Sequence, residues 1–510
     1  MSSSGVFQQL WNDVIRPGLC SGCGTCMAMT DNHFNPKELS SSFPWASGSP
    51  PARMLSLLLP PEAWEACPGK GMNYPELNRF FFESFPENWL IGHIRKSYIG
   101  YATDENVRRK AASGGVISRI TMYLLEQRLV DGVITIRQNP EKSLEVEPVL
   151  ITDPTEILSC SQSIYFPVPV NSILCGLETG KKYAFVGLPD QVASLRKLQL
   201  MGWKPATQID YVVGPYMGIN MDFAGIISFL HSNGVKNLSD VATLKFREGE
   251  WPGYLKVTTH TRKVITARKF YYNYLLPFYT TRHSLLTPDF TNELTDISVG
   301  DAWSPVYEKE GKGFSVVLAR TTKGLDLLEK MSQQSAVTPK SPEGDLPKPE
   351  TRNMIASAPP RNFDSKLEPN VQQHRHCEER SDEATVTSNQ KLIPLHLQEI
   401  SLSQALDMHG HMIDFKKRGS FIRIYWRNRM GRPAPDWGYM PESMSFMRYV
   451  VEVAISGIFA IGRWPLARWL VGRIPVSIIG PVFDVLRKSW KNISKPTKRK
   501  KLKETKFIIN

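Results

Sequence analysis

Long apolar runs are scarce in this 510-residue sequence. The longest nearly uninterrupted one, 450–462, has only 13 residues and already contains Glu452, whereas a membrane-spanning helix needs about 20 apolar residues. The first residues, MSSSGVFQQLWNDV, have neither the basic start nor the apolar stretch of a secretory signal. We therefore expect no spanning helix and a cytoplasmic protein.

Cysteine is scarce too. Seven cysteines in a chain of this length are too few for a disulfide scaffold, which indicates a reducing compartment. Hydrophobic residues make up 41% of the chain and charged residues 22%, a balance that excludes a wholly disordered protein.

The net charge of +13 is concentrated in two stretches. Residues 414–432 carry +6 and residues 491–510 carry +7, so the rest of the chain is balanced. Nucleic-acid binders spread basic residues over a recognisable reading domain, and no such motif is present. We therefore expect no nucleic-acid partner.

Apolar runs that alternate with glycine-bearing turns predict a mixed α/β fold. Strands are expected at 130–136, 183–187 and 211–215, helices at 116–127 and 191–200, and a strand followed by a helix within 315–331. Residues 339–391 break this pattern, with seven prolines between Pro339 and Pro369 and one aromatic residue. Such a composition predicts a disordered insertion.

The last 65 residues alternate apolar and basic side chains. Arg463, Arg468 and Arg473 are interleaved with Trp464 and Trp469, as in a helix that lies in a membrane interface. The lysine-rich stretch 495–503 would then contact anionic headgroups, which places the protein peripherally on the inner face of the membrane. A partner-binding or capping helix pair explains the same pattern equally well.

Three of the cysteines form one motif. Cys20, Cys23 and Cys26 are separated by two residues each, and Cys67 follows about forty residues later, directly before Pro68. Three thiolates at this spacing, with a fourth before proline, are typical of the ligands of a [4Fe–4S] cluster. A zinc site would use paired cysteines or add histidine, so the triple spacing disfavours it.

Three glycine-bearing turns are candidate ligand sites. Ser113-Gly114-Gly115 precedes an amphipathic helix, whose N-terminal N–H groups suit a phosphate or an electron-rich ring edge; helix capping is the alternative. Gly187 and Pro189 shape the turn after a predicted strand, where open α/β sheets bind ligands. The segment 292–303 ends in a third such turn.

These segments together resemble the coenzyme F-420 hydrogenase/dehydrogenase beta-subunit family. The likeness rests on CSGCGTC and CPG, RRKAASGGVISRI, VGLPDQVASLRKL, PDFTNELTDISVGDAW and KKRGSFIRI, and covers roughly 15–335 and 400–432. The family includes plant 7-hydroxymethyl chlorophyll a reductase and members encoded in polysaccharide gene clusters.

The resemblance implies an oxidoreductase with FAD and one [4Fe–4S] cluster. We expect five segments: a ferredoxin-like iron–sulfur segment (1–95), an α/β flavin-binding core (96–338), the insertion (339–392), a C-terminal part of the core (393–440) and a basic tail of amphipathic helices (441–510), which the resemblance does not cover. The residues that it assigns to the flavin site are Ser113, Gly114, Gly115, Gly187, Pro189, Gln191, Asp301, Lys417 and Arg418. A turn-capping role explains Asp301 equally well. A solvated basic face is an equally good explanation for Lys417 and Arg418.

The sequence departs from the family where a second cluster would bind. Asp190 and Tyr216 stand where relatives have cysteine, and 283–287 also lacks it, so one cluster is expected. Asp190 is interpreted as a helix N-cap, or alternatively as a proton donor beside the flavin. His283 is a second acid/base candidate, and a purely structural role is the alternative. Cys160 and Cys175, two isolated thiols, are expected in the core.

Two functions remain open at this point. The first is an oxidoreductase that passes electrons between a ferredoxin- or deazaflavin-type donor and a small-molecule or glycan substrate, in polysaccharide biosynthesis. The second is a non-catalytic interaction module with a structural cluster. Retention of all four cluster cysteines and of the Ser-Gly-Gly turn favours the enzyme.

Overall fold

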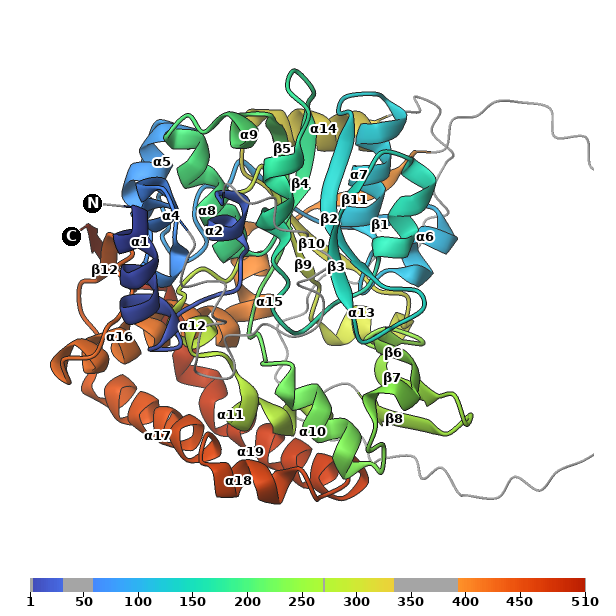
Figure 1. Cartoon of the computed structure of the whole chain (residues 1–510), viewed down its shortest axis with the longest axis vertical. Coiled ribbons are helices and arrows are strands. Elements are labelled where there is room, and N and C mark those ends of the chain that lie inside the picture. Colours follow the sequence, from blue (N-terminus) through green and yellow to red (C-terminus); the bar gives the residue numbers. More distant parts are fainter. Residues whose placement is uncertain (1–2, 31–57, 269–270, 334–392, 510) are drawn as a thin grey trace, which may run out of the picture.

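An eight-stranded mixed sheet lies at the centre of the fold (Figure 1). The computed structural model describes residues 3–30, 58–268, 271–333 and 393–509; the predicted insertion at 339–392 lies outside these residues. The strand order is β11–β1–β10–β9–β5–β4–β2–β3. The strands are β1 (Lys96–Ala102), β2 (Gly132–Gln138), β3 (Val146–Ile151), β4 (Tyr183–Val186), β5 (Ile209–Pro215), β9 (Ile297–Asp301), β10 (Ser315–Ala319) and β11 (Leu395–Glu399).

The mixed α/β class predicted from the sequence is confirmed. The expected strands correspond to β2, β4, β5 and β10, and the expected helices to α7 (Val116–Glu126), α8 (Pro189–Leu200) and α14 (Thr322–Gln333). Helix α8 begins at Pro189, and the Gln191 side chain accepts a hydrogen bond from the Leu188 N–H at 2.8 Å. Asp190 is therefore the second residue of the helix and Leu188 its N-cap, so the N-cap interpretation of Asp190 was wrong.

The strand directions bring the candidate turns to one edge of the sheet. Strands β2, β4, β5 and β9 are parallel, and β1 runs in the same direction because β10 is antiparallel to both β1 and β9. Their carboxyl ends therefore meet at a single edge. The segments that follow β1 and β4 carry residues 113–115 and 187–191, and Asp301 is the last residue of β9.

Helices cover both faces of the sheet. Helices α7 and α14 pack on one face, around Val133, Ala184 and Val317. Helices α8 and α15 (Leu402–Asp414) pack on the other face, over separate parts of the sheet. The described part of the N-terminal segment is helical, with α1 (Ser3–Leu10), α2 (Thr25–Ala28), α4 (Pro61–Glu65) and α5 (Tyr74–Phe82).

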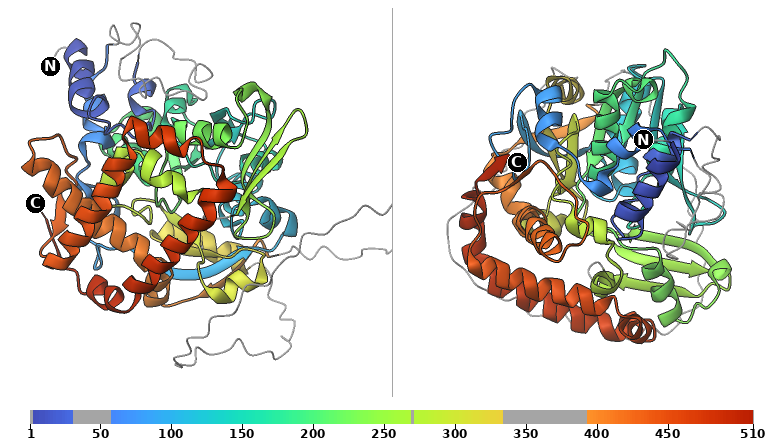
Figure 2. Two further views of the ribbon diagram at one scale, coloured as in Figure 1. Left: turned by 90° about the horizontal axis from the view of Figure 1, so that it is seen from below. Right: turned by 60° about the vertical axis from the view of Figure 1, so that its left-hand side comes forward.

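A smaller unit lies beyond the carboxyl edge. It contains the antiparallel strands β6 (Val241–Glu248), β7 (Tyr254–Thr259) and β8 (Val264–Arg268), and the helices α10 (Ala224–Ser232), α11 (Leu276–Tyr279) and α12 (Arg282–Leu286). The C-terminal helices α17 (Phe446–Gly462), α18 (Pro465–Val471) and α19 (Val476–Lys503) run along this end of the molecule (Figure 2). The chain closes with β12 (Tyr439–Pro441) paired to β13 (Phe507–Ile509).

In the part of the chain that the structure describes, no single helix has both the length and the apolar character of a membrane span. Helices α17 and α18 reach that length only as a pair, and the two are bent by 78° where they meet.

Candidate iron–sulfur and flavin site

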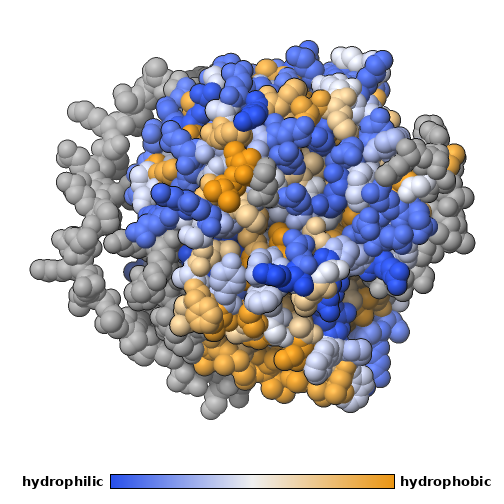
Figure 3. Space-filling model, turned by 90° about the vertical axis from the view of Figure 1, so that its left-hand side faces the viewer, coloured by the Kyte–Doolittle hydropathy of each residue, from blue (hydrophilic) through white to orange (hydrophobic). Residues whose placement is uncertain are grey.

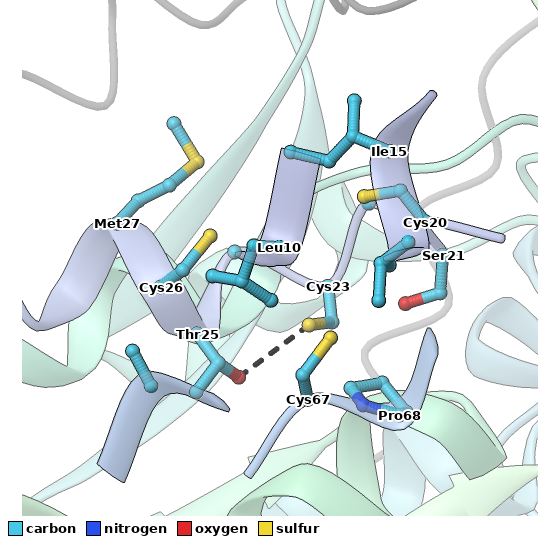
Figure 4. A pocket seen from close by; sticks show the side chains of 14 residues that line it. Leu10, Ile15, Cys20, Ser21, Cys23, Thr25, Cys26, Met27, Cys67 and Pro68 are labelled. Carbon is cyan, nitrogen blue, oxygen red and sulfur yellow. Dashed lines mark hydrogen bonds between the residues drawn. The ribbon is translucent and has the colours of Figure 1, made fainter. Parts of the chain in front are cut away.

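The four cysteines of the predicted cluster motif line one pocket (Figure 4). Cys20 and Cys23 lie on the loop that leads into α2, Cys26 is the second residue of that helix, and Cys67 lies directly before a short helical turn that begins at Pro68. The other lining side chains are apolar or small. The structure thus brings together two segments that lie about forty residues apart in the sequence.

Two glycines give the cysteine loop its curvature. Gly22 and Gly24 have φ angles of 74° and 91°, which side chains rarely adopt. A Cβ atom on Gly24 would also lie 2.6 Å from the carbonyl oxygen of Pro169. Only glycine therefore lets the loop pack this closely against the turn at 169–172.

Buried hydrogen bonds hold the two cysteine segments together. The Asn171 side chain donates to Thr25 Oγ1 at 2.9 Å, and the Thr25 and Ser194 hydroxyls are 2.6 Å apart. Ser194 Oγ in turn donates to the Ala66 carbonyl at 2.6 Å, next to Cys67. Helix α8, which carries Ser194, therefore fixes both halves of the cysteine pocket.

Burial keeps the four thiols protonated when no metal is bound. It raises the pKa of Cys67 to about 12, and it raises the pKa of Cys20, where the neighbouring Cys67 thiol adds to the effect. Backbone N–H groups oppose this shift: Gly22 donates towards Cys20, and Gly69 and Lys70 donate towards Cys67. Such donors stabilise metal-bound thiolate, and metal binding would release the protons.

The donor set of the pocket is four thiols, and no histidine or carboxylate of the described residues lines it. Four cysteine thiolates, one per iron, are the ligand set that a [4Fe–4S] cluster requires, so the residues present fit such a cluster. Ser21 Oγ, buried without a hydrogen-bond partner, is a further donor in the pocket wall.

Asp190 and His283 lie together beside this pocket. Asp190 Oδ2 is 3.9 Å from His283 Nε2, which also contacts Thr287 Oγ1 at 3.0 Å. Both side chains are buried, and burial lowers the pKa of His283, which keeps the ring neutral. Burial raises the pKa of Cys20 and Cys23, and the Asp190 carboxylate adds a smaller contribution, so the turn after β4 lies near the cysteine pocket.

The Ser113–Gly115 turn lies at the same sheet edge, at a distance from the cysteines. Strands β1 and β4 are four positions apart in the sheet, which corresponds to about 19 Å at the usual strand spacing. Ser113 Oγ donates to the Phe314 carbonyl at 2.6 Å, and a Cβ on Gly114 would lie 2.7 Å from the Gly100 carbonyl. Close packing against β1 and β10 is therefore one reason for these small residues.

Asp301 is paired with an arginine that sequence reasoning missed. Arg247, on β6, donates to Asp301 Oδ2 at 3.1 Å and to the Ala112 carbonyl at 2.6 Å. Arg247 therefore ties the end of β9 to the residue just before the Ser-Gly-Gly turn. Its side chain is buried, and an arginine in an alternating strand sequence gives no signal of an inward orientation.

Lys417 and Arg418 are buried, which excludes the solvated basic face considered for them. Lys417 forms an ion pair with Glu293 and donates to the Tyr439 hydroxyl at 2.6 Å. Arg418 is paired with Asp414. Phosphate binding by these two residues stays a prediction, and these internal partners lend it no support.

Two further thiols of the described residues lie apart from the cluster pocket. Cys160 is half-buried and Cys175 is exposed. The expected core position was wrong for Cys175, whose thiol donates to the Ser172 carbonyl at the protein surface.

Two family profiles match this chain within residues 97–344. Residues 97–175 match the N-terminal family profile of the coenzyme F420 hydrogenase/dehydrogenase beta subunit, and residues 180–344 match the profile of its C terminus. The cysteine segment and the C-terminal helices lie outside both profiles.

Curated relatives agree with the profiles. The chain is 27% identical over 258 residues to the coenzyme F420 hydrogenase subunit beta of Methanococcus voltae, an alignment that covers 49% of this chain and 86% of the relative. It is 22% identical over 344 residues to the coenzyme F420-dependent sulfite reductase of Methanocaldococcus jannaschii, covering 63% of this chain and 47% of the relative. A chain of the F420-reducing [NiFe] hydrogenase complex from Methanosarcina barkeri is 24% identical, with a TM-score of 0.39, and the match covers 48% of this chain and 81% of that one. Through residues 97–344, the chain belongs to the coenzyme F420 hydrogenase/dehydrogenase beta-subunit family.

Proposed function

We propose that this protein is an oxidoreductase that depends on FAD and one [4Fe–4S] cluster. It passes electrons between a ferredoxin- or deazaflavin-type donor and a small-molecule substrate. The observation that carries the proposal is the buried pocket lined by Cys20, Cys23, Cys26 and Cys67, next to a core that belongs to a family of redox-protein subunits.

The cysteine pocket is the proposed cluster site. A cluster held there would relay electrons one at a time. The chain contributes four thiolates, backbone N–H donors to Cys20 and Cys67, and apolar walls from Leu10, Val14 and Met27 that exclude water. Asp190 and neutral His283, on the inner side of the pocket, supply a carboxylate and an imidazole within 3.9 Å of each other.

The carboxyl edge of the sheet is the proposed flavin site. FAD would supply both hydride and single-electron transfer. Helix α7 begins at Val116, and its N-cap, Gly115, has no side chain to cap it, so the first N–H groups of the helix are available to an anionic group such as a phosphate. Gly187, Pro189 and Gln191 lie further along the same edge, and a dinucleotide is long enough to extend from one turn to the other.

The proposed substrate is a small molecule or a glycan of polysaccharide biosynthesis, and the proposed location is the inner face of the membrane. The family resemblance supports the substrate class. The apolar and basic C-terminal helices support the location.

A matched pair of cysteine variants tests the proposal. Cys26→Ser removes one of the four pocket thiols, whereas Cys175→Ser removes an exposed thiol outside the pocket. After anaerobic purification, Cys26→Ser should lose most of its iron and its reduction by ferredoxin or reduced deazaflavin, and Cys175→Ser should keep both. Equal iron in the two variants would contradict the cluster site. Iron without FAD in the wild type would indicate an interaction module with a structural cluster.

A further inference from the structure

The C-terminal helices expose a continuous apolar surface. Large apolar side chains of residues 446–486 that are more than a third exposed form this surface, here called the C-terminal apolar face. They include Phe446, Ile461, Trp464, Leu466, Trp469 and Ile478, with exposed fractions from 53% to 81%. Figure 3 shows apolar side chains gathered along the bottom of the molecule, where Figure 1 places α17 and α18. An apolar surface of this extent on a folded protein marks a binding face.

The polarity of these helices is the reverse of that of an ordinary surface helix. In α17 the charged side chains point inward: Glu452 is fully buried between Arg423 and Arg448, whose Nη1 lies 2.8 Å from Glu452 Oε2. Arg463 donates to the Thr280 carbonyl at 3.0 Å, and Arg468 donates to the Phe278 carbonyl at 3.0 Å. In a helix that covers a core, the apolar side faces inward.

From this arrangement we propose that the C-terminal apolar face docks onto an anionic lipid bilayer and inserts into its surface without crossing it. Residues 446–486 contain two acidic residues, Glu452 and Asp484, and both are buried, so no exposed carboxylate on this face opposes anionic headgroups. Arg473 is exposed beside Trp469, with its guanidinium 3.6 Å from the ring centre. Tryptophan and arginine in this relation are typical of helices at the bilayer surface.

The sequence that follows strengthens the attraction to anionic lipid. Residues 491–510 carry a net charge of +7, and each basic residue near an anionic membrane contributes about 1 kcal/mol. A second copy of the chain is a poorer occupant, because a symmetric dimer would bring basic surface against basic surface.

Shallow insertion follows from how the helices are anchored. Helix α17 has 17 residues and is bent from α18 by 78°. Crossing the bilayer would require Glu452 and its two arginines to leave the core. Helix α17 therefore lies along the bilayer surface.

Docking also orients the rest of the molecule. The segment 216–296 leads from the carboxyl end of β5 to β9 and carries α11, which packs on α17, and the turn 271–275, which packs on α19. The carboxyl edge of the sheet therefore faces the bilayer side.

Vesicle co-sedimentation of the full-length protein tests this inference. The vesicles contain either phosphatidylcholine alone or phosphatidylcholine with phosphatidylglycerol. The test variant combines Phe446→Ser, Ile461→Ser and Leu466→Ser. The control combines Leu58→Ser, Val264→Ser and Val306→Ser, which are 54% to 55% exposed and lie outside the C-terminal apolar face.

The wild type and the control should bind the anionic vesicles, and the test variant should bind at least tenfold more weakly. Equal binding by the test variant, or no binding by the wild type, would overturn the inference. So would a wild-type dimer that the test variant dissociates while neither binds vesicles. Iron and FAD content, measured on the same samples, reports on the proposed function separately, because docking does not involve the cofactors.

Discussion

Replacing Gly24 by alanine should loosen the cysteine loop without removing a sulfur atom. Gly24 has a φ of 91°, and holding alanine in that conformation costs about 1 to 2 kcal/mol. The new Cβ would lie 2.6 Å from Pro169 O and 2.8 Å from Ser172 N, both backbone atoms, and overpacking of this kind costs about 1 to 3 kcal/mol. The closed loop should therefore be destabilised by about 2 to 5 kcal/mol, at least about 30-fold in its equilibrium constant.

The assay is iron loss from the anaerobic protein in the presence of a chelator. Two control glycines separate the backbone strain from the steric clash. Alanine at Gly180 would have the unfavourable φ of 88° but no clash, and alanine at Gly176 would have neither the unfavourable φ nor a clash. Only Gly24→Ala should lose iron much faster than the wild type. If it keeps iron as long as Gly176→Ala, the pocket does not depend on this loop geometry, and the reasoning is refuted.

Three further predictions concern buried charge. Lys417→Met leaves Glu293 without its counterion and should lower the free energy of unfolding by about 3 to 5 kcal/mol; because burial already raises the pKa of Glu293 to about 7, the loss should grow as pH rises through that value. Burial lowers the pKa of His409 to about 4, whereas a free histidine titrates near 6.5. The free energy of unfolding should therefore fall by about 3 kcal/mol as the pH drops from about 6.5 to 4. His409→Phe should remove this pH dependence, as measured by urea unfolding at each pH. Glu452→Leu leaves Arg423 without its carboxylate partner and Arg448 with Asp414 alone, and should cost about 3 to 5 kcal/mol and expose α17 to limited proteolysis.

An exposed ion pair provides the control for the two buried ones. Lys503 and Asp407 lie 3.2 Å apart with more than a third of each side chain exposed, so Lys503→Met should change stability by less than about 1 kcal/mol. A similar small effect of Lys417→Met or Glu452→Leu would contradict the described burial. An unchanged pH profile in His409→Phe would show that another group titrates in that range.

The sequence predicted those features that local pattern determines. Alternating apolar runs located β2, β4 and β5, and the spacing of Cys20, Cys23 and Cys26 with the Cys67-Pro68 pair indicated four side chains that the structure indeed brings to one pocket. Glycine and proline carry strong local constraints, which is why the turns after β1 and β4 were found in the right places.

Features that depend on distant contacts were beyond the sequence. Asp190 and His283 are 93 positions apart, and only the packing of α8 against the segment 282–287 shows that they meet beside the cysteines. Lys417 and Arg247 find their partners because both side chains are buried. Lysine and arginine are usually exposed, so the residue types gave no reason to expect this burial. The interleaved arginines and tryptophans indicated an amphipathic tail, but not that Arg463 and Arg468 face the core.

The measurement that tests the central claim most directly is the cofactor content of the wild-type protein after anaerobic purification. Iron, acid-labile sulfide and released FAD are quantified per chain. The proposed function predicts one FAD with about four irons and four sulfides, the composition of a single cubane. One zinc per chain, or neither iron nor flavin, would contradict it.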